Sequence, residues 1–168
     1  MEYVPVDVEA RAAKAAAYFK QGFNCAQSVT AAFADLYGMS EEVALRCSAS
    51  FGGGIGRMRE TCGAACGMFL LAGLETGSVT PHDHAGKSRN YAVVQELAAE
   101  FVQQNGALKC ADLLRSAAPA AEAPASPQAE ARTPQYYAKR PCVRIVEEAV
   151  RIFAEYLNRS HREGSATD

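Results

Sequence analysis

Four of the six cysteines in this chain share one local setting. Cys25, Cys62, Cys110 and Cys142 each lie just ahead of a stretch whose residue pattern predicts a helix. The first turn of a helix has unpaired N–H groups and about half a positive charge, and both favour a thiolate. The thiolate is the form of cysteine that attacks electrophiles and binds metals. The sequence therefore predicts a protein that holds ionised sulfur.

A glycine-rich loop, Phe-Gly-Gly-Gly-Ile-Gly-Arg, lies shortly before Cys62. Its glycines are Gly52, Gly53, Gly54 and Gly56. Glycine has no Cβ and lets backbone amides approach a ligand closely, so we expect this loop to donate N–H hydrogen bonds to sulfur at a bound cofactor. A tight turn or a close crossing of two helices is the structural alternative for the same residues.

The candidate ligands come one from each segment, because the chain has no Cys-x-x-Cys pair of the kind used by zinc ribbons and thioredoxin-like proteins. They can meet only if several helices pack with their N-terminal ends converging. Converging positive ends disfavour a simple cation and favour an anionic centre. A two-iron cluster held by four thiolates is such a centre. The pattern predicts an iron–sulfur cofactor of the 2Fe-2S type, with the four cysteines as metal ligands.

The two remaining cysteines have other interpretations. Cys47 lies inside a predicted helix without a special flanking residue, which is typical of a small core residue. Cys66 lies one turn after Cys62 on the same helix face. A core residue, a spare ligand and a resolving thiol are all compatible with that position.

Other polar side chains near these motifs are expected to play ordinary roles. Arg57 and Arg59 follow the glycines, and we expect them to be solvated, with anion binding as the alternative. His82 and His84 flank Asp83. For them we expect a polar turn that begins the next helix, and a metal site is the alternative.

The segments that must position the cysteines have helical periodicity, and none alternates like a strand. The expected helices cover about residues 8–19, 25–37, 62–75 and 87–104, with further helices after Ser40, near Cys110 and after Pro141. The length of 168 residues fits a single helical domain, 1–168. The predicted fold is all-α, a compact multi-helix bundle whose helix N-termini converge on a cysteine cluster. Within it, residues 116–134 are rich in Ala and Pro and are expected to form a linker or flexible loop.

Composition narrows the classes of partner. The net charge of −2 argues against nucleic acid, which usually requires a strongly basic surface. No run of 18 apolar residues exists, so we expect no membrane insertion. The N-terminal residues do not resemble a signal peptide, which together with scattered cysteines leads us to expect a reducing cytoplasm. A redox partner of unknown identity and a homo-oligomer are both left open.

Taken together, these motifs resemble a known family. The sequence has Gly-Phe-Asn-Cys-Ala-Gln at 22–27, Phe-Gly-Gly-Gly-Ile-Gly at 51–56 and Cys-Gly-Ala-Ala-Cys-Gly at 62–67, and then two separated cysteines, Cys110 and Cys142. In this order the motifs are similar to those of the C_GCAxxG_C_C family, redox-active proteins named after their cysteine pattern. The resemblance covers about residues 10–158 apart from the Ala/Pro-rich segment.

The resemblance implies an all-helical domain with a redox role and four characteristic cysteines, which are Cys25, Cys62, Cys110 and Cys142 here. It also implies an iron–sulfur cluster, by relation to certain multihaem cytochromes with a similar domain. This chain has no Cys-x-x-Cys-His for the attachment of c-type haem. It departs from the family pattern through its two extra cysteines and the proline-bearing insertion before Cys142.

Three functions are compatible with these residues, in decreasing order of support. The first is an iron–sulfur protein that transfers or stores electrons. The second is metal-free thiol–disulfide chemistry, in which Cys62 is the thiolate and Cys66 or Cys25 resolves it. The third is a helical binding module without redox activity, with its cysteines packed in the core or bound to a structural zinc. The sequence does not decide between an enzyme and an electron carrier.

Overall fold

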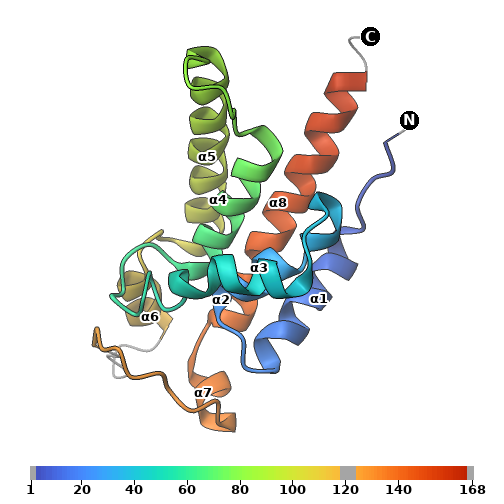
Figure 1. Ribbon diagram of the computed structural model, residues 1–168. Helices are drawn as coiled ribbons and strands as arrows, with labels where there is room; N and C mark the ends of the chain where they lie inside the picture. The colour runs from blue at the N-terminus through green and yellow to red at the C-terminus, as the bar shows by residue number, and fades with distance from the viewer. Residues whose placement is uncertain (1–2, 118–123, 166–168) are drawn as a thin grey trace.

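Helices make up the regular secondary structure of this protein (Figure 1). The computed structural model describes residues 3–117 and 124–165, and within these ranges it contains eight α-helices, two short 3-10 helices and no strands. The α-helices are α1 Val8–Lys20, α2 Cys25–Ala31, α3 Glu41–Ser48, α4 Gly63–Thr76, α5 His84–Asn105, α6 Cys110–Ala117, α7 Pro134–Lys139 and α8 Cys142–Ser165. The 3-10 helices are η1 Ala34–Tyr37 and η2 Ala49–Phe51. The predicted all-α fold is confirmed.

Short polar side chains start these helices, as the sequence predicts. Asn24 accepts a hydrogen bond from the Gln27 N–H and the Gln27 side chain accepts one from the Asn24 N–H, so α2 begins with a complete capping box. Ser40 caps α3 and Asp83 caps α5 through side-chain oxygens. The Asp83 cap confirms that the histidine-containing segment is a turn that begins a helix.

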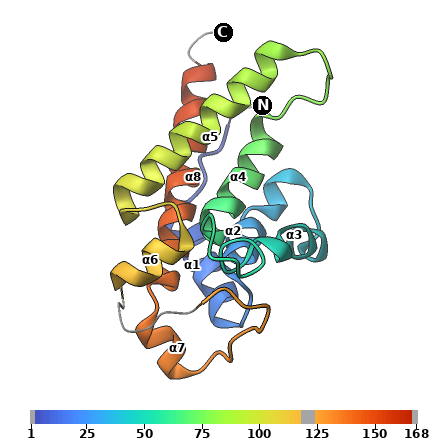
Figure 2. The ribbon, with the colours of Figure 1, turned by 90° about the vertical axis from the view of Figure 1, so that its left-hand side faces the viewer.

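The short helix α2 lies at the centre of the fold, packed against α1, α3, α4 and α8. Figures 1 and 2 show α4, α5 and the C-terminal part of α8 extending toward one end of the molecule and α7 at the other, with α1, α2 and α3 between them. The main core joins these groups, and in it the fully buried rings of Phe33 and Phe153 meet edge to face with centroids 5.1 Å apart. This packing fixes the start of α2 relative to the starts of α4 and α8.

The four predicted cysteines are all at helix starts. Cys25, Cys110 and Cys142 are the first residues of their helices, and Cys62 is the N-cap of α4. The sequence predicts Thr61 as that cap. Thr61 instead forms an isolated antiparallel bridge with the segment before α6, and this moves the helix start one residue on.

A segment without regular secondary structure, residues 124–133, runs to α7 and is called the strap below. It belongs to the predicted linker 116–134, of which residues 118–123 lie outside the described residues. The strap is anchored by Arg132, whose guanidinium stacks on the rings of Phe19 and Tyr136 at 4.3 and 4.7 Å. Arg132 also donates hydrogen bonds to the carbonyls of Phe19 and Phe23. The strap is therefore attached to the helical body.

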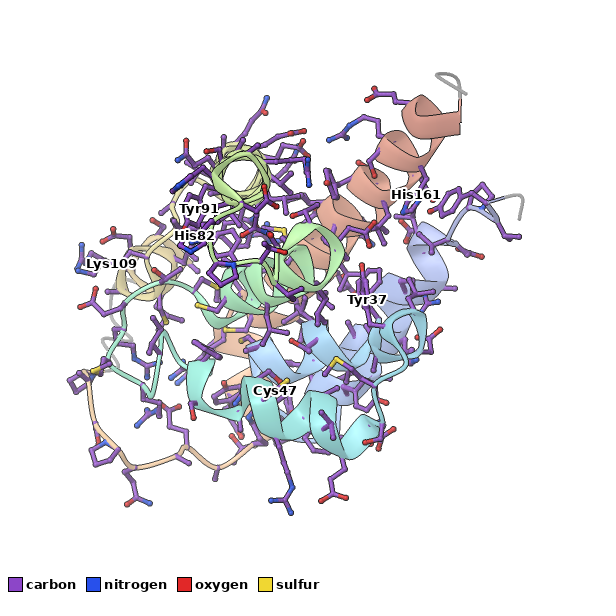
Figure 3. The ribbon with its side chains drawn as sticks, turned by 45° about the horizontal axis from the view of Figure 1, so that its top comes forward. Tyr37, Cys47, His82, Tyr91, Lys109 and His161 are labelled. Atoms are coloured by element: carbon purple, nitrogen blue, oxygen red, sulfur yellow. The ribbon has the colours of Figure 1, made fainter. Side chains whose placement is uncertain are left out.

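The core interpretation of Cys47 is wrong. Cys47 is exposed on α3, which Figure 3 shows at the surface of the molecule, and its Sγ donates to the Ala44 carbonyl of the preceding turn. The buried residues of α3 are Ala44 and Ser48, because this short helix turns only one narrow face toward α2.

Over the described residues, no helix is long and apolar enough to cross a membrane.

The crossing of α2 and α4 yields a stability prediction. A Cβ at Gly67 would lie 2.9 Å from the Ala26 carbonyl oxygen and 3.0 Å from Val29 Cβ, both on α2. Gly67→Ala should therefore lower the free energy of unfolding by about 1–3 kcal/mol, as overpacking does elsewhere. Urea denaturation followed by circular dichroism measures this change.

Gly73→Ala is the matched control on the same helix, because a Cβ there meets nothing within 4 Å. It should raise the free energy of unfolding by up to about 1 kcal/mol through helix propensity. Equal stabilities of the two variants would contradict the close approach of α2 and α4.

Candidate functional site

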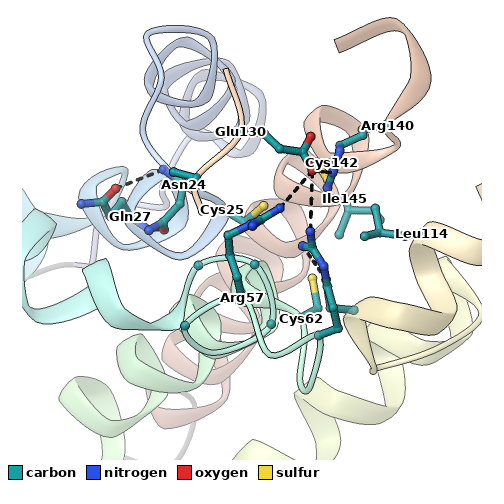
Figure 4. Close-up of a pocket in the computed structure, with 18 of the residues that line it drawn as sticks. Asn24, Cys25, Gln27, Arg57, Cys62, Leu114, Glu130, Arg140, Cys142 and Ile145 are labelled. Carbon is teal, nitrogen blue, oxygen red and sulfur yellow. Dashed lines mark hydrogen bonds and ion pairs between the residues drawn. The ribbon is translucent and has the colours of Figure 1, made fainter. Parts of the chain in front are cut away.

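The four predicted cysteines line one cavity of about 470 Å³ (Figure 4). Cys25 comes from α2, Cys62 from the cap of α4, Cys110 from α6 and Cys142 from α8. The lining does not include Cys66, a buried residue whose Sγ donates instead to the Thr61 carbonyl at 3.7 Å. The structure therefore brings together the four cysteines that the sequence selects and separates them from the other two.

Cys25 is positioned by the residue before it. Besides capping α2, the Asn24 side chain donates from Nδ2 to the Ala49 carbonyl at 2.9 Å. A Cβ at Gly52 would lie 2.4 Å from Asn24 Cγ, so the glycine loop rests directly on this cap. The identity of residue 52 is thus fixed by the packing that holds Cys25.

Cys110 is positioned by the segment that leads into α4. The N–H groups of Cys110 and Ala111 donate to the carbonyls of Glu60 and Arg59, at 2.6 and 3.2 Å. Arg59 Nη1 also donates to Cys110 Sγ at 3.8 Å. Burial raises the pKa of the Cys110 thiol, and the nearby Arg59 guanidinium opposes that rise.

The glycine loop has an unusual backbone. Five consecutive residues, 53–57, have φ between +57° and +76°, and Arg59 follows with φ +61°. Such angles strain residues with a side chain, and strained residues of this kind often occur at functional sites. Within the described residues, the N–H groups of Gly53 and Gly54 have no hydrogen-bond acceptor, and both glycines line the cavity. The Gly56 N–H, by contrast, donates to the Ser50 carbonyl and serves the loop itself.

The charged residues that line the cavity are mostly arginines. They are Arg57, Arg59, Arg132, Arg140 and a single acid, Glu130, so the described lining has four positive side chains and one negative. Solvation of Arg57 and Arg59 is therefore a wrong prediction: their side chains are only 18% and 7% exposed. Both guanidinium groups approach Glu130 on the strap.

The thiols differ in how readily they ionise. Burial raises the pKa of Cys62 to about 12, although the N–H groups of Ala65 and Ala64 at the start of α4 oppose this effect. Cys25 and Cys142 form a hydrogen-bonded pair, which raises the pKa of Cys25 and lowers that of Cys142. Arg140 and Arg132 lower the pKa of Cys142 further. Of the two thiols, Cys142 is therefore the one that ionises more readily.

The cavity offers donors of two kinds, cysteine thiols and backbone N–H groups. Among residues 3–117 and 124–165, no group of three or more His, Cys, Asp or Glu side chains is arranged to hold a single metal ion. A structural zinc needs four ligands at about 2.3 Å from one point. A cluster instead accepts thiolates distributed around a larger body, together with N–H donors to sulfur. Four thiols around a cavity and two N–H groups lacking acceptors are donors of the kinds that a cluster uses.

Comparison with known proteins gives one family. Residues 23–156 match the model of the family described as "Putative redox-active protein (C_GCAxxG_C_C)", which is most of the chain. Comparisons with curated proteins and with solved structures gave no match.

The contact between the glycine loop and Cys110 yields a second prediction. A Cβ at Gly54 would lie 2.6 Å from Cys110 Cβ and 2.8 Å from Arg59 Cα. Gly54→Ala should displace Cys110 and lower the free energy of unfolding by about 3 kcal/mol or more, the sum of left-handed strain and overpacking. Alkylation of Cys110 in the native protein, followed by peptide mass spectrometry, should be faster than in wild type.

Gly56→Ala is the matched control, since it has a similar left-handed φ but its Cβ would meet only the Ser50 carbonyl oxygen at 3.9 Å. It should lower stability by about 1–2 kcal/mol and leave Cys110 alkylation unchanged. If both variants behave alike, Gly54 is required for its backbone angle alone.

Proposed function

Because this chain belongs to the C_GCAxxG_C_C family of redox-active proteins, we propose that it holds an iron–sulfur cluster, of the two-iron type, for electron transfer or storage. The proposed ligands are Cys25, Cys62, Cys110 and Cys142. The observation that supports it best is that all four thiols line one cavity although they come from four separate helix starts. Gly53 and Gly54 are the proposed amide donors to the sulfurs.

The electrostatics of the cavity support a centre that is negatively charged overall once its thiolate ligands are counted. Thiolates packed together repel one another, and burial further disfavours their charge. The positive ends of α2, α4, α6 and α8 and the four lining arginines act in the opposite direction. The helix N-termini and the arginines thereby offset the negative charge of several thiolates in this cavity.

Other lining residues would exclude water from a bound cluster, and Arg59 would influence its reduction. Leu113, Leu114 and Ile145 give the cavity an apolar side, and Tyr136 covers it near the strap. When bound, a two-iron cluster supplies one-electron oxidation and reduction. Arg59, which hydrogen-bonds to Cys110 Sγ, favours the more negative, reduced state of any centre held there.

A second candidate is metal-free thiol–disulfide chemistry, favoured by the position of the Cys25 and Cys142 thiols in one cavity and by the lowered pKa of Cys142. In this reaction the two thiols lose two electrons and two protons and form a disulfide. A disulfide of a partner protein takes up both and is reduced to two thiols. The pair differs from the Cys62–Cys66 and Cys62–Cys25 pairs that the sequence suggests.

Iron binding tests the first proposal. Protein purified without oxygen and reconstituted with ferrous iron and sulfide should contain iron and labile sulfide and absorb visible light. Replacement of any one of the four cavity cysteines by Ser should reduce the iron content at least several-fold, because each would be a ligand. Iron and sulfide assays with absorption spectra measure the effect.

Cys47→Ser and Cys66→Ser are the matched controls and should retain the wild-type iron content, since neither residue lines the cavity. Folded wild-type protein that stays colourless and iron-free after reconstitution would contradict the proposal. A reversible Cys25–Cys142 disulfide in that same sample would favour the second candidate.

A further inference from the structure

Three arginines meet one carboxylate oxygen at the mouth of the cavity. Arg57 Nη2 and Arg140 Nη2 donate to Glu130 Oε1 at 3.0 and 2.5 Å, and Arg59 Nη2 lies 3.8 Å from the same oxygen. Figure 4 shows these contacts as dashed lines that converge on Glu130. A planar carboxylate has two oxygens, and here all three guanidinium groups approach the same one. Glu130 therefore matches this site poorly in geometry.

The arginines are more firmly held than the carboxylate between them. The side chains of Arg57, Arg59 and Arg140 are 18%, 7% and 13% exposed, whereas that of Glu130 is 40% exposed. Arg57 and Arg59 project from the strained glycine loop, and Arg140 stacks over the Tyr136 ring at 4.7 Å. The positive groups are thus built into the body of the protein, and the negative group is on the strap above them.

The strap is held by the same loop. Arg57 Nη1 donates to the carbonyls of Ser126 and Gln128, and its Nη2 donates to Glu130. The Arg57 guanidinium thus binds two backbone carbonyls and one carboxylate of the strap. An anion bound at this site would replace its contact with the Glu130 carboxylate. The strap residues Pro127 and Ala129 line the cavity beside Glu130.

We propose that Arg57, Arg59 and Arg140 form a binding site for a tetrahedral oxyanion, a phosphate or sulfate group, which displaces Glu130 and the strap. Such a group offers a separate oxygen to each guanidinium and can bind each through paired hydrogen bonds, which is the geometry that Arg recognises best. Displacement of Glu130 leaves Arg57, Arg59 and Arg140 without this carboxylate, so they can offset the charge of the incoming anion. The cavity, at about 470 Å³, lies in the range of small-molecule sites and can hold more than the oxyanion alone.

The site adjoins the sulfur centre. Arg59 contacts Cys110 Sγ through Nη1 and faces Glu130 through Nη2. An oxyanion at the position of the Glu130 carboxylate would therefore share an arginine with one of the four cavity thiols. This assignment goes beyond the proposed cluster and does not depend on it, because none of the three arginines needs a metal for its position.

Calorimetric titration of the reduced, metal-free, full-length protein tests the site, with inorganic phosphate, sulfate and a small phosphate monoester as separate probes at constant ionic strength. Glu130→Gln removes the internal competitor and keeps its size, so it should bind at least one of these probes at least tenfold more tightly than wild type. Adding Arg140→Gln to that variant should weaken binding by tenfold or more. Tighter binding of the monoester than of inorganic phosphate would identify the phosphate group of a larger molecule as the ligand, and equal binding would identify the free oxyanion.

Arg46→Gln in the Glu130→Gln background is the matched control, because Arg46 is an exposed arginine of α3 paired with Glu42. It should leave the affinity unchanged. Glu130→Gln with affinity no greater than wild type for any probe, or chloride binding as strongly as phosphate, would overturn the proposal.

Hydrogen exchange in the wild-type protein provides an independent readout that requires no variant to fold. A saturating concentration of the tightest-binding probe should increase exchange in residues 124–133, since the anion takes over the contacts of Glu130. Slower or unchanged exchange there would overturn displacement of the strap. The calorimetric affinities and the hydrogen exchange are both measured without iron, so they test the anion site even if iron reconstitution fails.

Discussion

Helix N-termini carry like partial charges, so several of them can face one cavity only if negative charge lies between them. In this protein the starts of α2, α4, α6 and α8 face the same space, and arginines add to their field. In the described lining, the sulfurs of Cys25, Cys62, Cys110 and Cys142 and the carboxylate of Glu130 can supply the negative charge. The arrangement of the helices and the chemistry of the cysteines are therefore consequences of one electrostatic constraint.

Burial opposes the ionisation of the cavity thiols, because it raises their pKa values. The pKa of Cys62 is raised to about 12 because the sulfur is buried, so burial alone would keep it protonated at neutral pH. The interaction with Cys25 and the nearby arginines lower the pKa of Cys142. A cofactor that brings positive iron to the sulfurs would stabilise the buried Cys62 thiolate. It would also bind Cys142, whose pKa is already lowered. The glycine loop and the strap, joined through Arg57, both line this cavity.

Local signals explain how much of the fold and site the sequence predicts. Asn24 and Gln27 form a capping box within four residues, and this motif identifies the helix start that carries Cys25. Ser40 identifies the start of α3 in the same way, whereas Thr61 misplaces the start of α4 by one residue. The contact of Arg57 with Glu130 joins residues 73 positions apart, and neither residue has a local partner that would reveal it. The predicted burial of Cys47 is wrong because the sequence pattern does not show how many residues of α3 contact the rest of the protein. Only Ala44 and Ser48 of this helix are buried.

An anaerobic crystal structure of the reconstituted protein, phased or checked by the anomalous scattering of iron, tests the central claim most directly. We predict an iron peak inside the cavity, with the sulfurs of Cys25, Cys62, Cys110 and Cys142 as its protein ligands. Iron bound elsewhere, or held by fewer than these four sulfurs together with other side chains, would contradict it.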